Sequence, residues 1–290
     1  MLYLTHFTFP DADREFDFRL TVKRTCYDTL YPFGVLSAKG LTEIVFEPIT
    51  ILYGGNGCGK STALNVIAQR LNLSRDTLYN RSNFFENYLS LCHYDLKGRL
   101  PAQSRIITSD DVFDYMINLR GINQGVDLRR EEIFAEYYEQ REHPYQLKSL
   151  EDYEELKRVN QARHMTQSRY TRANLANNVP EQSNGESALF YFTNKIGENG
   201  LYLLDEPENS LSPMKQLELV QFIQDSARFF GCQFVIATHS PFVLSLRGAR
   251  IYDLDADPAT LRRWTDLEGV RAYYDFFREH KEEFEKETKD

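Results

Sequence analysis

The chain has 290 residues, an ordinary globular composition and a formal net charge of −9. This length suits one large α/β domain, or one with an inserted subdomain. The negative charge argues against a surface that binds nucleic acid throughout, although it leaves room for a local basic groove.

The N-terminal residues, MLYLTHFTFPDADREF, lack the basic start and the continuous apolar stretch of a signal peptide. No later stretch approaches the ~20 apolar residues that cross a bilayer. The four cysteines form no C-x-x-C pair, which indicates neither a zinc site nor a disulfide framework. We therefore expect a soluble, cytoplasmic protein.

The first chemical motif is ILYGGNGCGKST at residues 51–62, where an apolar run breaks into four glycines. Its spacing fits Gly-x-x-x-x-Gly-Lys-Ser, which begins here at Gly54 and ends at Ser61. In such a loop, backbone N–H groups surround the β-phosphate, the lysine reaches the β- and γ-phosphate oxygens, and the serine hydroxyl binds Mg²⁺. The alternative is an ordinary glycine-rich turn.

Both flanks of this motif favour the phosphate loop. Residues 49–53 are rich in strand formers, and residues 62–71 place apolar residues at helical spacing. The sequence therefore predicts a P-loop NTPase. Its predicted nucleotide-binding residues are Gly54, Gly55, Asn56, Gly57, Cys58, Gly59, Lys60, Ser61 and Thr62.

Residues 111–180 read mainly as helix. The stretches 129–138 and 150–157 combine mixed charges with periodic apolar positions. We expect a short helical insertion, because the segment has no room for a long coiled coil. It ends in a basic run without acidic residues, which is a solvated helix face, a contact with a nucleic-acid backbone, or a contact with the triphosphate of another subunit. The basic residues are Lys157, Arg158, Arg163, His164, Arg169 and Arg172.

The stretch SNGES at residues 183–187 directly precedes a helical pattern. A serine, an Asn-Gly pair and a helix N-terminus together form an anion site. Because the chain already has one phosphate loop, a second anion site suggests that two copies meet around one nucleotide. Read alone, the same residues are typical of a capped helix start.

The apolar residues 201–204 lead directly into Asp205 and Glu206. This pattern predicts a buried parallel strand that delivers carboxylates to the crevice where α/β sheets bind ligands. Asp205 is placed to hold Mg²⁺, and Glu206 to polarise the water that attacks the γ-phosphate. Many strands end in acids, so the pair is informative only beside a phosphate loop.

A further apolar strand, within residues 232–238, is followed by His239. A histidine there can hydrogen-bond the γ-phosphate or the attacking water. The alternative is a structural histidine that caps the strand end.

The chain closes with a predicted strand at residues 250–255 and a helix from about residue 266. We expect the aromatic residues of this helix to pack it on the sheet in a core role. Nothing after the helix resembles a nuclease or Toprim domain, so we expect any effector activity to reside in a partner chain. The aromatic residues are Tyr273, Tyr274, Phe276 and Phe277.

The ordered motifs GGNGCGKST, SNGES, LYLLDEP, NSLS and IATHS resemble the ABC-type ATPase family over nearly the whole chain. Within it, the chain is most similar to the stand-alone, non-transporter members: the RecF, SMC and OLD-like ATPases. The usual signature, Leu-Ser-Gly-Gly-Gln or Glu, is altered here, since Gln182 replaces the leucine and Asn184 the first glycine. Asparagine tolerates the left-handed conformation that a glycine adopts.

The resemblance implies an α/β P-loop NTPase fold of ABC-ATPase type. Its central sheet is mostly parallel, with an N-terminal antiparallel β part and a helical insertion. We expect the β part and the P-loop in residues 1–110 and the insertion in residues 111–180. The signature, Walker B motif, histidine switch and C-terminal helix then occupy residues 181–290, within one ATPase domain overall.

The resemblance also implies Mg²⁺-dependent ATP hydrolysis by a head-to-tail homodimer with two ATP molecules at the interface. Residues 209–212 match the loop that links the two sites. In this scheme Glu206 and His239 are catalytic and Ser61 and Asp205 bind the metal. Lys60 and these four residues of one subunit face Ser183 and Gly185 of the other.

Two sites typical of the family are not assigned to a single residue. The glutamine that normally ligates Mg²⁺ has no clear counterpart, with Gln103, Ser109 and Asp110 as candidates. The aromatic residue that stacks on adenine could be any of Tyr27, Tyr31, Phe33 and Phe46.

The predicted function is an ATP-driven dimer switch that gates an effector protein or a nucleic acid, as in DNA repair, chromosome maintenance or phage defence. One alternative is the ATPase subunit of a membrane transporter, which would need a hydrophobic groove for its membrane partner. Another is a nucleotide-dependent binding module with negligible turnover, against which Glu206 argues.

Overall fold

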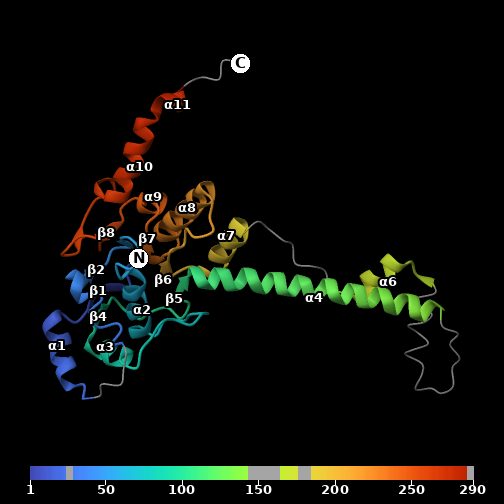
Figure 1. Cartoon of the computed structure of the whole chain (residues 1–290), viewed down its shortest axis with the longest axis horizontal. Coiled ribbons are helices and arrows are strands. Elements are labelled where there is room, and N and C mark those ends of the chain that lie inside the picture. The colour runs from blue at the N-terminus through green and yellow to red at the C-terminus, as the bar shows by residue number, and fades with distance from the viewer. Residues whose placement is uncertain (24–28, 143–163, 176–183, 286–290) are drawn as a thin grey trace. The chain divides into compact units, whose positions relative to one another are not determined.

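The computed structural model describes residues 1–23, 29–142, 164–175 and 184–285 (Figure 1). The chain divides into two compact units. The larger combines Met1–Val112 with Asn184–Asp290, and the smaller is Phe113–Ser183.

The larger unit is built on a six-stranded sheet with the strand order β5-β6-β7-β3-β8-β9. Neighbouring strands run parallel from β5 to β8, and β9 pairs antiparallel with β8. All residues of β3 and β7 are buried, as expected for central strands covered on both faces. The strands are β5 (Arg105–Thr108), β6 (Leu201–Asp205), β7 (Gln233–Thr238), β3 (Ile49–Tyr53), β8 (Arg250–Asp253) and β9 (Thr260–Leu261).

A second, antiparallel sheet has the order β2-β1-β4, with β2 (Glu43–Val45), β1 (Leu4–Thr8) and β4 (His93–Leu96). The fully buried Gln233 of β7 ties it to the central sheet. Its Oε1 accepts hydrogen bonds from the backbone N–H groups of Tyr3 and Leu4, and its Nε2 donates to the Leu4 carbonyl. The mostly parallel central sheet and the N-terminal antiparallel part are therefore both as predicted.

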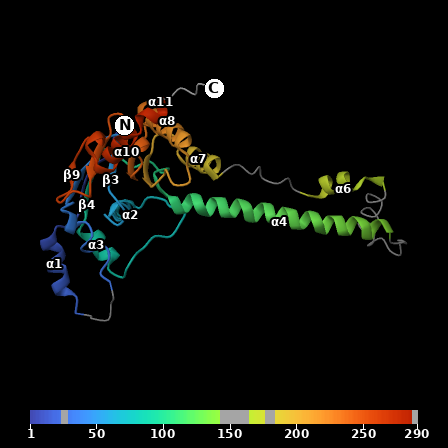
Figure 2. The ribbon, with the colours of Figure 1, turned by 45° about the horizontal axis from the view of Figure 1, so that its top comes forward.

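Helices cover the central sheet. The mostly buried α2 (Lys60–Arg70) contacts β6 and β7, and α8 (Pro213–Phe229) packs beside α7 (Asn184–Lys195), as Figure 2 also shows. Ser212 caps α8 by accepting from the Lys215 N–H, and Pro213 occupies the first turn, where its missing N–H costs nothing. The unit also contains α1 (Ala12–Thr21), η1 (Ser37–Lys39), α3 (Phe85–Leu91), α9 (Pro241–Leu244), η3 (Trp264–Asp266), α10 (Glu268–Glu279) and α11 (Lys281–Glu285).

Asp76 fastens α7 to the edge of the central sheet. Its Oδ2 accepts hydrogen bonds from Lys195 Nζ at 2.7 Å and Tyr191 Oη at 2.9 Å, both from α7. Its Oδ1 lies 3.4 Å from the Arg105 guanidinium of β5. The hydrogen bond from Lys195 is the main reason why the pKa of Asp76 lies below its ordinary value.

The described part of the predicted helical insertion is helical. Residues 129–138 belong to one long helix, α4 (Ser109–Glu142), and residues 150–157 lie outside the described residues. In the smaller unit, Ile133 and Tyr137 of α4 form a small apolar cluster with Tyr170 of α6 (Gln167–Asn174). No helix among the described residues, α4 included, is apolar over the length needed to cross a membrane.

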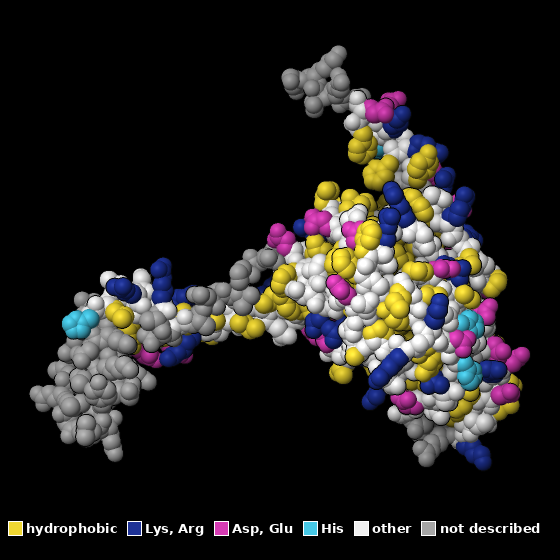
Figure 3. Space-filling model, turned by 180° about the vertical axis from the view of Figure 1, so that it is seen from behind, with side chains coloured by type: hydrophobic (Ala, Val, Ile, Leu, Met, Phe, Trp, Pro, Cys, Tyr) yellow, Lys and Arg dark blue, Asp and Glu magenta, His cyan; other side chains and the backbone are white. Residues whose placement is uncertain are grey.

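The expected core role of the aromatic residues on the C-terminal helix is wrong. Tyr273, Tyr274, Phe276 and Phe277 of α10 are between 52% and 55% exposed. The reason is that the helix is anchored mainly at its start, where the Gly269 N–H donates to Tyr53 Oη and Leu267 and Val270 are buried. Figure 3 shows the resulting hydrophobic side chains along α10 and α11, just below the grey C-terminal atoms.

Candidate nucleotide site

The predicted phosphate loop lies between β3 and α2, at the edge of the sheet where the parallel strands end. Three of its glycines adopt positive φ angles, which other residues rarely do: φ is 154° at Gly54, 81° at Gly57 and 103° at Gly59. A side chain on Gly54 would also lie 2.5 Å from the Cys58 Sγ. Glycine is therefore required at Gly54 both for its conformation and for the close approach of the chain.

Lys60 lies at the centre of this loop and is only 4% exposed. Its Nζ donates to the carbonyls of Gly54 at 2.7 Å and Gly55 at 2.9 Å. The same Nζ lies 3.8 Å from Glu206 Oε1. The Lys60 ammonium group thus lies between the loop and the end of β6.

Asp255 was not singled out in the sequence. It follows β8, and its Oδ2 accepts a hydrogen bond of 2.8 Å from the Gly55 N–H. This bond fastens the start of the phosphate loop to the neighbouring strand. The available signal was an acidic residue just past a strand that ends at the same edge as β3.

Ser61 and Asp205, the predicted metal ligands, lie together. Ser61 Oγ donates to Asp205 Oδ1 at 3.0 Å. The pKa of Asp205 is raised to about 6, chiefly by burial; the Ser61 hydrogen bond opposes this rise and the charge of Glu206 contributes to it. One hydroxyl and one carboxylate suit Mg²⁺, which usually combines a few protein oxygens with phosphate oxygens and water. Among the described residues no cluster of three His, Cys, Asp or Glu offers an all-protein metal site.

Glu206 adopts a backbone conformation that is unusual for its residue type, with φ of 48°. Its N–H donates to the Ala237 carbonyl of β7 at 2.9 Å, and its Oε2 accepts from Asn209 Nδ2 at 3.1 Å. Its Oε1 lies 3.7 Å from His239 Nδ1. The bend at Glu206 thus turns a carboxylate toward both Lys60 and His239, the arrangement expected of a group that orients water.

Glu208 is a second residue that the sequence reasoning missed. It is 5% exposed, and its Oε1 accepts hydrogen bonds from Thr238 Oγ1 at 2.6 Å and from the N–H groups of His239 and Ser240 at 3.0 and 3.2 Å. This carboxylate therefore holds the backbone of residues 238–240, the histidine loop. The available signal was the third acid in the run Asp-Glu-Pro-Glu.

The loss of this carboxylate should destabilise the fold. We expect Glu208→Ala to lower the free energy of unfolding by about 2–4 kcal/mol, because two buried N–H groups and a hydroxyl lose their acceptor. Glu208→Gln should cost less, since its amide oxygen can still accept. Urea denaturation measures both.

The matched control for this prediction is Glu218→Ala on α8, where the side chain is 50% exposed and pairs with Lys215. Such an exposed pair contributes roughly 0–1 kcal/mol. Equal effects of Glu208→Ala and Glu218→Ala would refute the role given to Glu208.

The two predicted trans contacts are only partly described. Gly185 lies in the first turn of α7, whereas Ser183 lies outside the described residues. A Cβ on Gly185 would lie 3.3 Å from the Ser210 carbonyl, so Gly185 is next to the loop at residues 209–212. The start of α7 and this loop after Glu208 therefore form one continuous surface.

The three candidates for the Mg²⁺-ligating glutamine of the family lie at different ends of the strands. Gln103 Nε2 donates to the carbonyls of Glu198 and Asn199. These two residues precede β6 and so lie at the N-terminal ends of the parallel strands, whereas Asp205 lies at the C-terminal end of β6. Gln103 is thus too far along the sheet to serve the metal pair. Ser109 and Asp110 follow β5 at the correct edge, because Thr108 is in register with Asp205.

The adenine candidates are also distinguished. Phe33 and Phe46 are buried at 6% and 2% exposure, which removes their faces from a ligand. Tyr31 is partly exposed, and its Oη donates to Thr62 of α2 at 3.2 Å. Tyr27 lies outside the described residues. Among the described candidates, Tyr31 alone combines exposure with contact to the phosphate-loop helix.

The basic run is described only in part. His164, Arg169 and Arg172 are exposed in the smaller unit, and neither arginine side chain forms an ion pair there among the described residues. Lys157, Arg158 and Arg163 lie outside the described residues.

Residues 129–245 match the family model described as an AAA domain, putative AbiEii toxin, type IV TA system. Similar solved structures include the SMC head domain from Thermotoga maritima, at 12% identity over 90% of this chain and 98% of that one, with a TM-score of 0.39. The Smc head domain with an extended coiled coil, bound to the C-terminal domain of ScpA, from Pyrococcus furiosus has 12% identity over 81% and 95%, with a TM-score of 0.38. A dimeric ATP-binding cassette in a post-hydrolysis state with ADP and Pi has 15% identity over 78% and 90%, with a TM-score of 0.37. No curated protein sequence matches significantly.

Proposed function

We propose that this chain, whose ordered motifs resemble those of the stand-alone ABC-type ATPases, is a Mg²⁺-dependent ATPase whose ATP-bound dimer gates a partner. The observation that carries the proposal is the convergence of Lys60, the Ser61–Asp205 pair, Glu206 and His239 at one sheet edge. These groups lie in the first turn of α2 and at or just after the ends of β6 and β7, and together they meet the needs of phosphoryl transfer.

Each side chain has a distinct role in this proposal. Lys60 stabilises negative charge on the β- and γ-phosphate oxygens, and Ser61 and Asp205 hold Mg²⁺, which neutralises phosphate charge when bound. Glu206 accepts a hydrogen bond from the attacking water and orients it. His239, whose imidazole lies beside Glu206, binds the γ-phosphate, so its position depends on whether the triphosphate is intact.

In the proposed dimer, the start of α7 contacts the nucleotide of the other copy. Ser183 and Gly185 precede or begin this helix, whose N-terminal N–H groups and dipole favour an anion. We infer that they bind the γ-phosphate held by the P-loop of the second copy. Residues 209–212 lie beside Gly185 and follow Glu206 by only a few positions, so they can couple the two sites.

The partner is either an effector protein or a nucleic acid. The family description names a toxin and a toxin–antitoxin system, which supports a role in defence. For nucleic acid, the supporting feature is the exposed pair Arg169 and Arg172 on α6. An effector protein fits the negative net charge of the chain better.

Sedimentation tests the ATP-dependent dimer. Glu206→Gln should retain bound ATP, and a triphosphate held across the interface then stabilises association by mass action. We expect this variant with ATP and Mg²⁺ to sediment as a dimer. Adding Ser183→Arg, which puts a bulky side chain into the trans phosphate site, should return it to the assembly state seen without ATP.

The matched control adds Ser90→Arg, the same change at an exposed serine of α3, which should leave the ATP-dependent dimer intact. If the Glu206→Gln protein sediments identically with and without ATP, the nucleotide does not control assembly and the proposal of a trans phosphate site is abandoned.

A further inference from the structure

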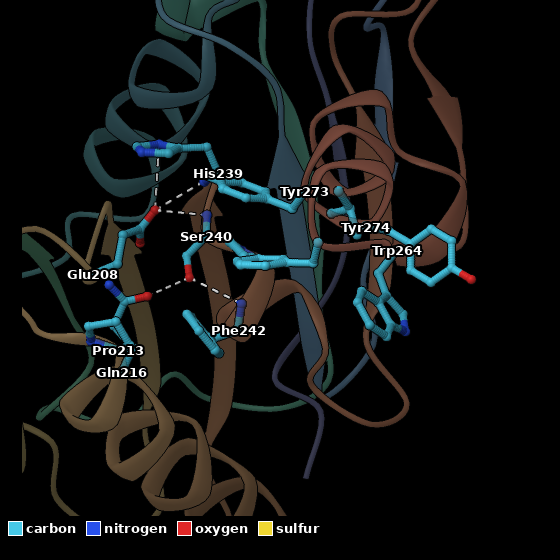
Figure 4. A pocket seen from close by; sticks show the side chains of 12 residues that line it. Glu208, Pro213, Gln216, His239, Ser240, Phe242, Trp264, Tyr273 and Tyr274 are labelled. Carbon is cyan, nitrogen blue, oxygen red and sulfur yellow. Dashed lines mark hydrogen bonds and ion pairs between the residues drawn. The ribbon is translucent and has the colours of Figure 1, made fainter. Parts of the chain in front are cut away.

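A pocket of about 560 Å³ lies between the histidine loop and α10, a volume within the range of ligand sites. Figure 4 shows Glu208, Gln216 and His239 at one side, Trp264 and Tyr274 at the other, and Tyr273 between them. The walls are almost entirely aromatic or aliphatic. They are formed by Phe242, Trp264, Val270, Tyr273, Tyr274 and Phe277.

The polar side of the pocket carries an unused acceptor. Glu208 is 5% exposed, and its Oε1 accepts three hydrogen bonds, but its Oε2 is buried without a hydrogen-bond partner among the described residues. A buried carboxylate oxygen without a donor is costly, and a cation with N–H groups is its best partner. Glu208 therefore marks this pocket for a positively charged ligand.

The aromatic walls suit the same kind of ligand. Rings around a carboxylate attract a cation through their negative faces, and a planar guanidinium can stack on a ring while it donates to a carboxylate. Arg271 and Arg278 already lie over the ring of Tyr274, at 5.0 and 5.6 Å from its centroid, and Asp275 pairs with both. Phe277 packs edge-on against Phe276 and Phe284, whereas the rings of Trp264 and Tyr273 meet neither a cation nor another ring among the described residues and are left for a ligand.

The surrounding charge favours a basic partner too. Together α10 and α11 carry six acidic and three basic residues, and the whole chain has a net charge of −9. The net negative charge of these two helices and of the whole chain attracts a basic segment and repels a second copy of this acidic chain.

We propose that this pocket binds an arginine side chain, flanked by apolar residues, from a segment of the partner protein. The inference rests on the proposed function, because a gated partner must contact the chain near the residues that sense ATP. His239 supplies that link, since its N–H donates to Glu208 Oε1 and its Nδ1 lies 3.7 Å from Glu206 Oε1. A guanidinium on Glu208 would compete for the carboxylate that holds His239 in place.

Tryptophan fluorescence tests the pocket directly, because Trp264 is the only tryptophan of the chain and lines it. The probes are the tripeptides acetyl-Leu-Arg-Leu-amide and acetyl-Leu-Gln-Leu-amide, titrated into the full chain without nucleotide. We expect a saturable change in Trp264 emission and about tenfold tighter binding of the arginine peptide. Glu208→Gln, which retains an acceptor for the N–H groups but loses the charge, should abolish that preference.

Phe277→Ser should weaken both peptides, whereas Phe16→Ser on α1 is the matched control, because Phe16 is 59% exposed and does not line the pocket. Three results would overturn the proposal: no saturable change up to about 10 mM peptide, equal affinity for both peptides, or a nucleotide-independent self-association that Phe277→Ser removes, which would make a second copy the occupant. Because these titrations contain no ATP, their failure is distinguishable from failure of the ATP-dependent dimer.

Discussion

Lys60→Ala should weaken ATP binding by about 10²-fold or more, because two or three charge-assisted hydrogen bonds to phosphate oxygens are lost together. The lysine Nζ is held by the carbonyls of Gly54 and Gly55, so no other described cation is placed to replace it within the loop. Isothermal titration calorimetry with ATP and Mg²⁺ measures the change.

The matched control for this prediction is Lys281→Ala, which removes the same charge from the exposed side of α11. It should bind ATP as the parent protein does. The far-ultraviolet circular dichroism of Lys60→Ala should match that of the parent, which separates lost binding from lost folding. Undiminished ATP affinity in a folded Lys60→Ala protein would refute the assignment of the phosphate loop.

Glu206→Gln should slow ATP hydrolysis by about 10²–10⁴-fold, the usual contribution of a positioned general base, while ATP affinity is retained. The amide keeps the shape of the side chain and an oxygen for Asn209 Nδ2, so the φ of 48° should be preserved. Phosphate release in a single turnover measures the chemical step without product dissociation.

The control here is Glu218→Gln, an equivalent change at an exposed acid of α8, for which hydrolysis should be unchanged. A Glu206→Gln protein that hydrolyses ATP within about threefold of the parent rate would assign the base to another residue. The two variants also separate two functions of the site: Lys60→Ala loses ATP binding, whereas Glu206→Gln loses ATP hydrolysis.

Features determined by consecutive residues could be predicted from the sequence. The phosphate loop needs glycines at fixed offsets between a strand and a helix, and all of that lies in residues 49–71. Likewise the apolar run of β6 ends directly in Asp205 and Glu206, and that of β7 ends directly before His239. Since parallel strands end at one edge of a sheet, these motifs imply a common site before any coordinates are known.

Several features were decided only by the tertiary structure. The Glu208 carboxylate meets Thr238 at a separation of 30 residues, and Asp255 meets the Gly55 N–H at a separation of 200, contacts that depend on strand order and not on local pattern. Gln103 was removed as a metal ligand because it lies at the opposite end of the strands from Asp205.

The aromatic residues of α10 show the same limit. Helical spacing of apolar residues predicts a face that has to be covered, and the amphipathic pattern of α10 was correctly identified as helix. It does not specify what covers that face. Because α10 is anchored mainly at its start, by Gly269 and Val270, the rings of Tyr273 and Phe277 border a pocket and not the core. Periodicity is a property of the chain itself, whereas burial depends on which neighbour the fold brings against it.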